Sequence, residues 1–269
     1  MSELLAEAAM NPDWKSRYEV AVAAAQKAGH HALSYFDCGT AVDWKDDRSP
    51  VTVADREAEQ ILRQELLGPF PMDGFLGEES GDSPGTSGFR WIIDPVDGTR
   101  NFVRDIPLWA TLVGLEYRGE IIAGVAFLPA MGACTYRALR GDGCWKNDRR
   151  IHVSKTPQIE ESTLFYSSRA WFLKAGKDRE FYTLAAQTQR QRGFGDFYGF
   201  VLVAQGSGEL MVDHGLQSWD IAALSVIVEE AGGKFTNWSG KRSFSGPDVI
   251  ASNGVVHDAA LRFLGGKTA

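Results

Sequence analysis

Apolar residues recur at helical spacing in two segments of the first quarter of the chain. In the first segment, residues 14–36, the apolar positions are Tyr18, Val20, Val22, Ala25, Ala28 and Leu33. In the second, residues 55–67, they are Ala58, Ile61, Leu62 and Leu66, and Gly68-Pro69 follows as a stop signal. A stripe that repeats about every 3.6 residues predicts a helix with one buried face. Both segments are therefore predicted to be helices.

The middle of the chain changes to the pattern of short buried strands. Apolar runs bounded by turn residues are typical of antiparallel sheet. The predicted strands are residues 91–93, 111–117, 121–128, 135–139 and 143–146. Arg118-Gly119 marks a hairpin turn between two of them. Pro95 has no N–H group to donate to a sheet, so we expect it to end the first strand.

Helices and strands alternate in the remainder of the chain. The pattern predicts strands at residues 163–166, 209–212 and 248–252. It predicts helices at residues 178–188, 198–205 and 220–230, with a last helix near the C-terminus. A chain that mixes both kinds of element throughout folds into layers, so the predicted class is α+β. We expect two subdomains, residues 1–153 and 154–269.

Composition and charge exclude several classes of protein. The chain has 269 residues, of which 44% are hydrophobic, so it can bury a sizeable core and is not expected to be disordered. Its 28 Lys and Arg and 35 Asp and Glu residues give a net charge of −7, which argues against a nucleic-acid partner. No apolar run approaches the roughly 18–20 residues of a membrane span, and residues 1–10 lack a signal-peptide pattern. With only three cysteines, the chain is predicted to be cytoplasmic and free of membranes.

The stretch from Trp91 to Thr99 carries the most chemical information. A predicted strand delivers Asp94 to its end, and Asp97-Gly98 follows as a turn dipeptide. Such a turn directs two carboxylates toward one point, where they repel unless a cation lies between them. Mg²⁺ prefers oxygen ligands and commonly pairs a few carboxylates with phosphate oxygens. The alternative is an ordinary Asp-Gly turn that caps a helix starting near Asn101.

Three further segments place acids at the ends of predicted elements. Glu78 and Glu79 follow the apolar Phe75-Leu76, Asp220 opens the helix near residue 220, and Asp55 opens the helix near residue 55. Each of these acids, taken alone, is equally typical of a residue that stabilises a helix N-terminus.

Taken together, the segments resemble the inositol monophosphatase family in order and spacing. The matching pieces are Lys45…Ser49-Pro50-Val51-Thr52…Asp55, then GEES, DPVDGT and WDIAAL, which span about Lys45 to Gly233. The resemblance implies a layered α/β/α/β/α sandwich and a homodimer. It also implies Mg²⁺-dependent removal of phosphate from small alcohols, with two or three Mg²⁺ ions per subunit.

The resemblance also implies a role for each motif residue. The first metal ion would be held by Glu78, Asp94 and the backbone carbonyl of Val96. The second would be held by Asp94, Asp97 and Asp220. Asp55 and Glu79 would either bind a third, more weakly held metal ion or contact the ligands of the first two ions without touching metal. The amides of Gly98 and Thr99 would hold the phosphate. Thr99, bonded to Glu78 or Asp55, would orient and deprotonate the attacking water.

Substrate choice must depend on residues around the leaving group. Asp196 lies in a Gly-Asp-x-Tyr pattern that resembles the histidinol-phosphate phosphatases of the family, and Asp213 falls where members place an acid that contacts the substrate. A carboxylate among aromatic rings suits a cationic or imidazole-bearing alcohol. The alternative for Asp196 is a helix N-cap. The sequence therefore predicts a histidinol-phosphate phosphatase of histidine biosynthesis.

Three other functions remain open at the level of sequence. The first is hydrolysis of inositol phosphates by the same chemistry. The second is a nucleotidase for 3′-phosphoadenosine phosphates, which should show basic residues near Asp196, whereas residues 195–210 contain neither Lys nor Arg. The third is a non-catalytic binding protein, which the complete set of acids disfavours. Trp44 or Trp171 is expected near the mouth of the site.

Overall fold

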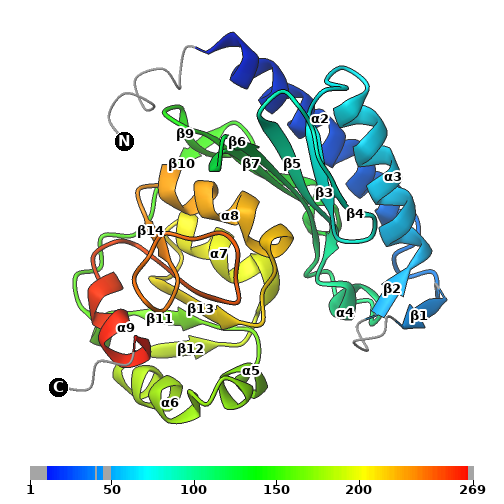
Figure 1. Cartoon of the computed structure of the whole chain (residues 1–269). Coiled ribbons are helices and arrows are strands. Elements are labelled where there is room, and N and C mark those ends of the chain that lie inside the picture. Colours follow the sequence, from blue (N-terminus) through cyan, green and yellow to red (C-terminus); the bar gives the residue numbers. More distant parts are fainter. Residues whose placement is uncertain (1–10, 40, 45–49, 266–269) are drawn as a thin grey trace.

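The computed structural model describes residues 11–39, 41–44 and 50–265. The predictions made for residues 1–10, and Lys45 and Ser49 of the first motif, lie outside these ranges. Two helices, α2 (Pro12–Leu33) and α3 (Val53–Leu67), pack against each other on one face of the first sheet (Figure 1). They confirm the two predicted helices. Thr52 caps α3 through its hydroxyl and accepts the amide of Ala54 at 3.1 Å.

The first sheet has eight strands in the order β10-β9-β8-β7-β6-β5-β3-β4. Only the pairing of β3 with β5 is parallel within this sheet. The strands are β3 (Gly74–Gly77), β4 (Gly81–Ser83), β5 (Phe89–Asp97), β6 (Ala110–Tyr117), β7 (Glu120–Leu128), β8 (Cys134–Leu139), β9 (Gly143–Lys146) and β10 (Arg149–Ile151). The five predicted strands and the hairpin at Arg118-Gly119 are confirmed. Sequence analysis missed β4 and β10, which have three residues each.

The second sheet has five strands in the order β12-β11-β13-β15-β14. They are β11 (Thr163–Phe165), β12 (Arg190–Arg192), β13 (Leu210–His214), β14 (Lys234–Thr236) and β15 (Asp248–Ser252). Between the two sheets lie α7 (Asp196–Ala204) and α8 (Ser218–Glu230), and the outer helices are α5 (Arg169–Lys174), α6 (Asp178–Gln187) and α9 (His257–Leu264). These five layers are the predicted sandwich. The division near residue 153 stays a prediction.

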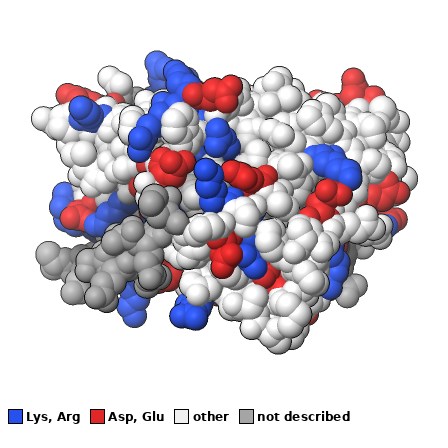
Figure 2. Space-filling view, turned by 90° about the horizontal axis from the view of Figure 1, so that it is seen from above, with Lys and Arg blue, Asp and Glu red and all other residues white. Residues whose placement is uncertain are grey.

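The small elements complete the described part of the chain. A two-stranded antiparallel sheet of β1 (Val42–Trp44) and β2 (Pro50–Thr52) precedes α3, and α4 (Thr99–Phe102) follows β5. Short 3₁₀ turns cover Pro129–Met131 and Ile159–Glu161. None of the helices among the described residues combines the length and the apolar character needed to cross a membrane. Basic and acidic side chains are interspersed on the face shown in Figure 2.

The expectation that Pro95 ends its strand is wrong. β5 continues to Asp97, and its pairing with β6 shifts register between Asp94 and Asp97. Proline is tolerated at such a bulge because no ladder hydrogen bond is required of its nitrogen, and the Pro95 carbonyl accepts the Thr111 hydroxyl at 2.9 Å. In a regular strand, residues three apart point to opposite faces. The bulge therefore allows Asp94 and Asp97 to reach one place.

Two glycines of the first sheet set the depth at which α8 packs. A Cβ atom added to Gly124 would lie 2.3 Å from the Ala223 carbonyl oxygen, and one added to Gly114 would lie 3.1 Å from the Ala222 Cβ. Larger residues would push α8 away from the sheet, because packed interiors leave no room for the extra atoms. The close approach brings Asp220, in the first turn of α8, toward the end of β5.

Candidate active site

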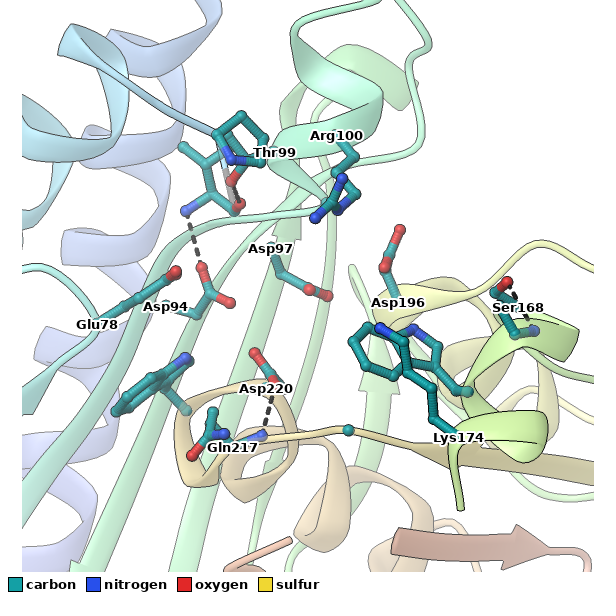
Figure 3. A pocket seen from close by; sticks show the side chains of 17 residues that line it. Glu78, Asp94, Asp97, Thr99, Arg100, Ser168, Lys174, Asp196, Gln217 and Asp220 are labelled. Atoms are coloured by element: carbon teal, nitrogen blue, oxygen red, sulfur yellow. Dashed lines mark hydrogen bonds between the residues drawn. The ribbon is translucent and has the colours of Figure 1, made fainter. Parts of the chain in front are cut away.

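A cavity of about 680 Å³ opens at the end of β5 and beside the first turns of α4, α7 and α8. α5 forms its far wall. The lining residues that carry chemistry are Glu78, Asp94, Asp97, Thr99, Arg100, Ser168, Trp171, Lys174, Asp196, Gln217 and Asp220. Figure 3 shows that Glu78, Asp94, Asp97 and Asp220 point into a common space, with Asp196 and α5 across from them.

Three acids form the centre of the cavity. Asp94, Asp97 and Asp220 each offer one carboxylate oxygen, and these three oxygens lie within 4.8 Å of one another. Backbone amides fix all three side chains. Asp94 Oδ1 accepts the amide of Val96 at 3.1 Å, Asp97 Oδ2 that of Phe197 at 2.6 Å, and Asp220 Oδ2 that of Gln217 at 2.6 Å. The acids are thus held together by elements from both halves of the chain.

The environment of these acids opposes their ionisation. Burial is the largest cause that raises the pKa of Asp94 and Asp97 well above the ordinary range, followed by the charge of Glu78 for Asp94 and of Asp196 for Asp97. Burial likewise raises the pKa of Asp220 to about 7, against the opposing bond from the Gln217 amide. A divalent cation removes this repulsion, and a cluster of carboxylate oxygens is the donor set that suits Mg²⁺. The residues therefore fit the predicted metal.

Without metal, the free energy of unfolding is expected to fall as the pH rises toward 7. The pKa of Asp220 rises from its ordinary 3.8 to about 7 in the fold, so between these values the native state binds more protons than the unfolded chain and loses stability with rising pH. In EDTA, Asp220→Asn should therefore show a smaller fall in melting temperature between about pH 5 and pH 7.5 than the wild type. Circular dichroism measures both. Equal falls would show that Asp220 carries no such penalty.

The other predicted ligands of the first metal ion lie beside this cluster. Glu78 directly follows β3, lines the cavity, and donates its amide to the Ile93 carbonyl at 3.3 Å. Its charge raises the pKa of Asp94, as expected for two neighbouring carboxylates. The Val96 carbonyl oxygen accepts the Thr99 hydroxyl at 2.9 Å. The assignment of Glu78, Asp94 and Val96 as ligands stays a prediction.

Thr99 is bonded to Asp55, one of the two partners that sequence analysis allowed. Its hydroxyl lies 3.0 Å from Asp55 Oδ1 and 2.9 Å from the Val96 carbonyl oxygen. The second oxygen of Asp55 accepts both the amide and the hydroxyl of Thr52, at 2.8 and 2.6 Å. Burial is the main cause that raises the pKa of Asp55. A buried carboxylate of raised pKa is well suited to accept a proton through Thr99.

Gly98 has a conformation that requires glycine. Its φ is +90°, and an added Cβ atom would lie 2.8 Å from the Leu108 carbonyl oxygen. The residue precedes the single turn of α4. The first amides of a helix have no partner within it. Gly98 and Thr99 both line the cavity, and the binding of phosphate by their amides stays a prediction.

The alternative interpretation of Asp196 as a helix N-cap is wrong. Asp196 is the first residue of α7, the N-cap position is Gly195, and the free amide of Phe197 is bound by Asp97 rather than by Asp196. Instead, Asp196 Oδ2 accepts the side-chain amide of Asn101 at 2.9 Å, and the same amide group donates to the Leu108 carbonyl at 2.9 Å. Burial raises the pKa of Asp196 to about 6, and the positive charge of Arg100 opposes this rise. Asp196 lines the cavity, and its predicted contact with the substrate stays a prediction.

Asp213 and Glu79 are less exposed to the cavity than the resemblance implied. Neither is among the lining residues. Asp213 is 1% exposed and accepts the Ser167 hydroxyl and the His214 amide, and burial raises its pKa to about 7. The Glu79 amide donates to Glu59 Oε2 at 2.9 Å. The predicted contacts of Asp213 and Glu79 with substrate or metal stay predictions.

Sequence analysis missed the basic side chains of the cavity. Arg100 and Lys174 both line it, although neither belongs to residues 195–210, the segment around Asp196. Trp171, one of two tryptophans expected at the mouth, lies in the wall on α5, and the ammonium of Lys174 is 4.1 Å from its ring centroid. Trp44 is 66% exposed and does not line the cavity. The lack of Lys and Arg in residues 195–210 therefore does not exclude a substrate with a second phosphate.

Comparison with known proteins gives one consistent family. Residues 13–265 match the model of the inositol monophosphatase family. A histidinol-phosphatase of Chlorobaculum parvum is 38% identical, over 95% of this chain and 98% of the relative. An inositol-1-monophosphatase of Mesorhizobium japonicum is 35% identical, over 90% of this chain and 94% of the relative.

A solved structure extends this likeness to the fold. The extragenic suppressor protein SuhB of Bartonella henselae superposes with a TM-score of 0.87 and 33% identity, covering 93% of this chain and 98% of that one. The layered sandwich and the motifs that line the cavity thus point to the same group of proteins.

Proposed function

The chain belongs to the inositol monophosphatase family and is a phosphoric monoester hydrolase, and we propose that it hydrolyses histidinol phosphate in a Mg²⁺-dependent reaction. The observation that carries the substrate assignment is Asp196, a carboxylate directed into the cavity opposite the cluster of Asp94, Asp97 and Asp220. An acid in this place suits an alcohol that bears an ammonium group. The histidinol-phosphatase relative, at 38% identity, supports the same choice.

The cluster and the first turn of α4 would bind the phosphate end of the substrate. Glu78, Asp94, Asp97, Asp220 and the Val96 carbonyl would hold Mg²⁺. Bound Mg²⁺ supplies charge neutralisation for the phosphate and lowers the pKa of water. The Gly98 and Thr99 amides would donate to phosphate oxygens. Because these fixed groups would hold the ester in the orientation needed for attack by water, the reaction would proceed as an effectively unimolecular step.

Thr99 and Asp55 would handle the proton of the attacking water. The Thr99 oxygen would accept a hydrogen from water while its own proton passes to Asp55 Oδ1, 3.0 Å away, and leaves the Val96 carbonyl oxygen, 2.9 Å away. Both bonds from Thr52 go to Asp55 Oδ2 and hold the side chain in place. Its other oxygen, Oδ1, faces the Thr99 hydroxyl. Proton transfer through a positioned side chain contributes roughly 10²–10⁴-fold to a rate.

Asp196→Asn tests the substrate assignment. Asparagine tolerates the φ of +46° found at this position and keeps an oxygen for Asn101, so the fold should be retained. Loss of a charge-assisted hydrogen bond to the histidinol ammonium should reduce kcat/KM by roughly 10- to 100-fold. Hydrolysis of inositol-1-phosphate, which has no cation, should change much less. Phosphate release from both substrates measures this difference.

The control for that variant is its melting temperature, which should remain close to that of the wild type. An equal loss of kcat/KM on the charged and the neutral substrate would remove Asp196 from substrate selection. The proposed phosphatase activity would then remain, but the structure would give no reason to prefer histidinol phosphate as its substrate.

Substrates with a second phosphate form the second candidate. Arg100 and Lys174 bring positive charge into the leaving-group side of the cavity, which suits an additional anion. A phosphoadenosine phosphate or a sugar bisphosphate offers one. Under this alternative, Lys174→Met would weaken hydrolysis of the bisphosphate and leave histidinol phosphate almost unaffected, in the same assay of phosphate release.

The proposed quaternary structure and pathway rest on the family resemblance, and the proposed location rests on the composition of the chain. We propose a homodimer that works in the cytoplasm as a step of histidine biosynthesis. Light scattering coupled to gel filtration measures the dimer directly.

A further inference from the structure

Glu59 is a buried acid with no place in the predicted site. It lies on α3, one helical turn after Asp55, and is 3% exposed. Its Oε2 accepts the amide of Glu79 at 2.9 Å, and its Oε1 accepts the amide of Ser80 at 2.7 Å. Both oxygens of one side chain thus bind the two amides that directly follow Glu78.

The chain before Glu78 is shaped around the same carboxylate. A Cβ atom added to Gly77 would lie 2.6 Å from the carboxyl carbon and from both oxygens of Glu59. Any larger residue would displace the carboxylate or the strand end. Glu59 therefore contacts the backbone on both sides of Glu78, from Gly77 to Ser80.

α3 connects this contact to the rest of the cavity. Residues four apart lie on the same side of a helix, so one face of α3 presents Asp55 to Thr99 and Glu59 to the turn after β3. Hydrogen bonds from N–H groups to a carboxylate are stronger than those between neutral groups. Because Asp55 and Glu59 both belong to α3, this helix fixes the turn that carries Glu78 relative to Asp55, which binds Thr99.

We propose that Glu59 is a positioning residue that holds Glu78 in place for metal binding. The proposal rests on the proposed metal site of Glu78 and Asp94, and it assigns Glu59 no contact with metal or substrate. Residues that orient a metal ligand without touching the metal change affinity by roughly 10- to 100-fold when replaced. A residue that only stabilises the fold would lower the melting temperature without changing the affinity of the folded molecules for metal.

The test compares Glu59→Gln with Glu57→Gln on the whole protein. Glutamine at position 59 keeps one acceptor oxygen but turns an NH₂ group toward a backbone N–H, which breaks one of the two bonds. Glu57 lies on the same helix and binds His31 and Tyr35, away from the cavity. Mn²⁺ is the probe for the metal, and its binding in the absence of substrate is measured by electron paramagnetic resonance.

Glu59→Gln should raise the Kd for Mn²⁺ about tenfold or more, raise the Mg²⁺ concentration for half-maximal activity, and leave KM at saturating Mg²⁺ within about twofold. Glu57→Gln should match the wild type in each measurement. If Glu59→Gln does not fold, Glu59→Asp, which keeps the charge but withdraws it by one methylene, is judged by the same criteria. An unchanged Kd in a folded variant would overturn the role of Glu59. Failure of the wild type to bind Mn²⁺ would instead overturn the metal site.

Discussion

Asp94→Asn is expected to reduce kcat by roughly 10³-fold or more, which corresponds to about 4 kcal/mol of transition-state stabilisation. Asp94 is the acid that the family resemblance assigns to both metal ions, and its carboxylate lies in the three-acid cluster beside Glu78. An amide offers one neutral oxygen in place of a charged pair, so it weakens both sites at once. Steady-state phosphate release in saturating Mg²⁺ measures the loss.

The fold of Asp94→Asn should survive, because the native acid is buried among like charges when metal is absent. Its pKa is raised first by burial and then by Glu78, so removal of its charge relieves repulsion. In EDTA at about pH 7.5 the variant should melt no lower than the wild type. Asp178→Asn, at an exposed pair with Arg169, serves as a control with normal turnover. Near-normal turnover of Asp94→Asn in Mg²⁺ would contradict the metal assignment.

Thr99→Ala is expected to reduce kcat by roughly 10²- to 10⁴-fold while KM changes little. The substitution removes the hydroxyl that joins the water to Asp55 but keeps the backbone amide proposed to hold phosphate. An interaction made only in the transition state affects kcat, whereas one made equally in the bound substrate affects KM. Full kinetic curves in saturating Mg²⁺ separate the two.

Thr99→Ser provides the matched control, since it retains the hydroxyl and loses only a methyl group. It should recover most of the activity of the wild type. A tenfold rise in KM with kcat unchanged in Thr99→Ala would make Thr99 a binding residue. The proton path through Asp55 would then be wrong.

Regular patterns made most of the fold predictable. The stripes of residues 14–36 and 55–67 became α2 and α3 because each buries one face, and that periodicity is visible along the chain. The missed strands β4, β10, β12 and β14 have three residues each, too few for alternation to show. β5 was predicted too short because a bulge at Pro95 depends on the facing strand. A sequence pattern contains no information about that partner.

The acids of the site were predictable because they occur in short motifs at the ends of elements. Their partners were not, since these come from distant segments. Asn101 contacts Asp196 across 95 residues, and α5 brings Lys174 to a cavity whose acids begin at Glu78. Glu59 belongs to none of the motifs, and its two amide contacts arise only because α3 packs beside the turn after β3. Local spacing predicts the groups that act, and the packing of layers determines what holds them.

The most direct test of the central claim is the kcat/KM of the purified protein for histidinol phosphate and for inositol-1-phosphate, each in Mg²⁺ and again in EDTA. We expect release of phosphate from histidinol phosphate to be favoured by at least about tenfold, the value of one charge-assisted contact with Asp196, and to stop in EDTA. Equal or greater activity on inositol-1-phosphate would contradict the substrate assignment. Undiminished activity in EDTA would contradict the metal-dependent mechanism itself.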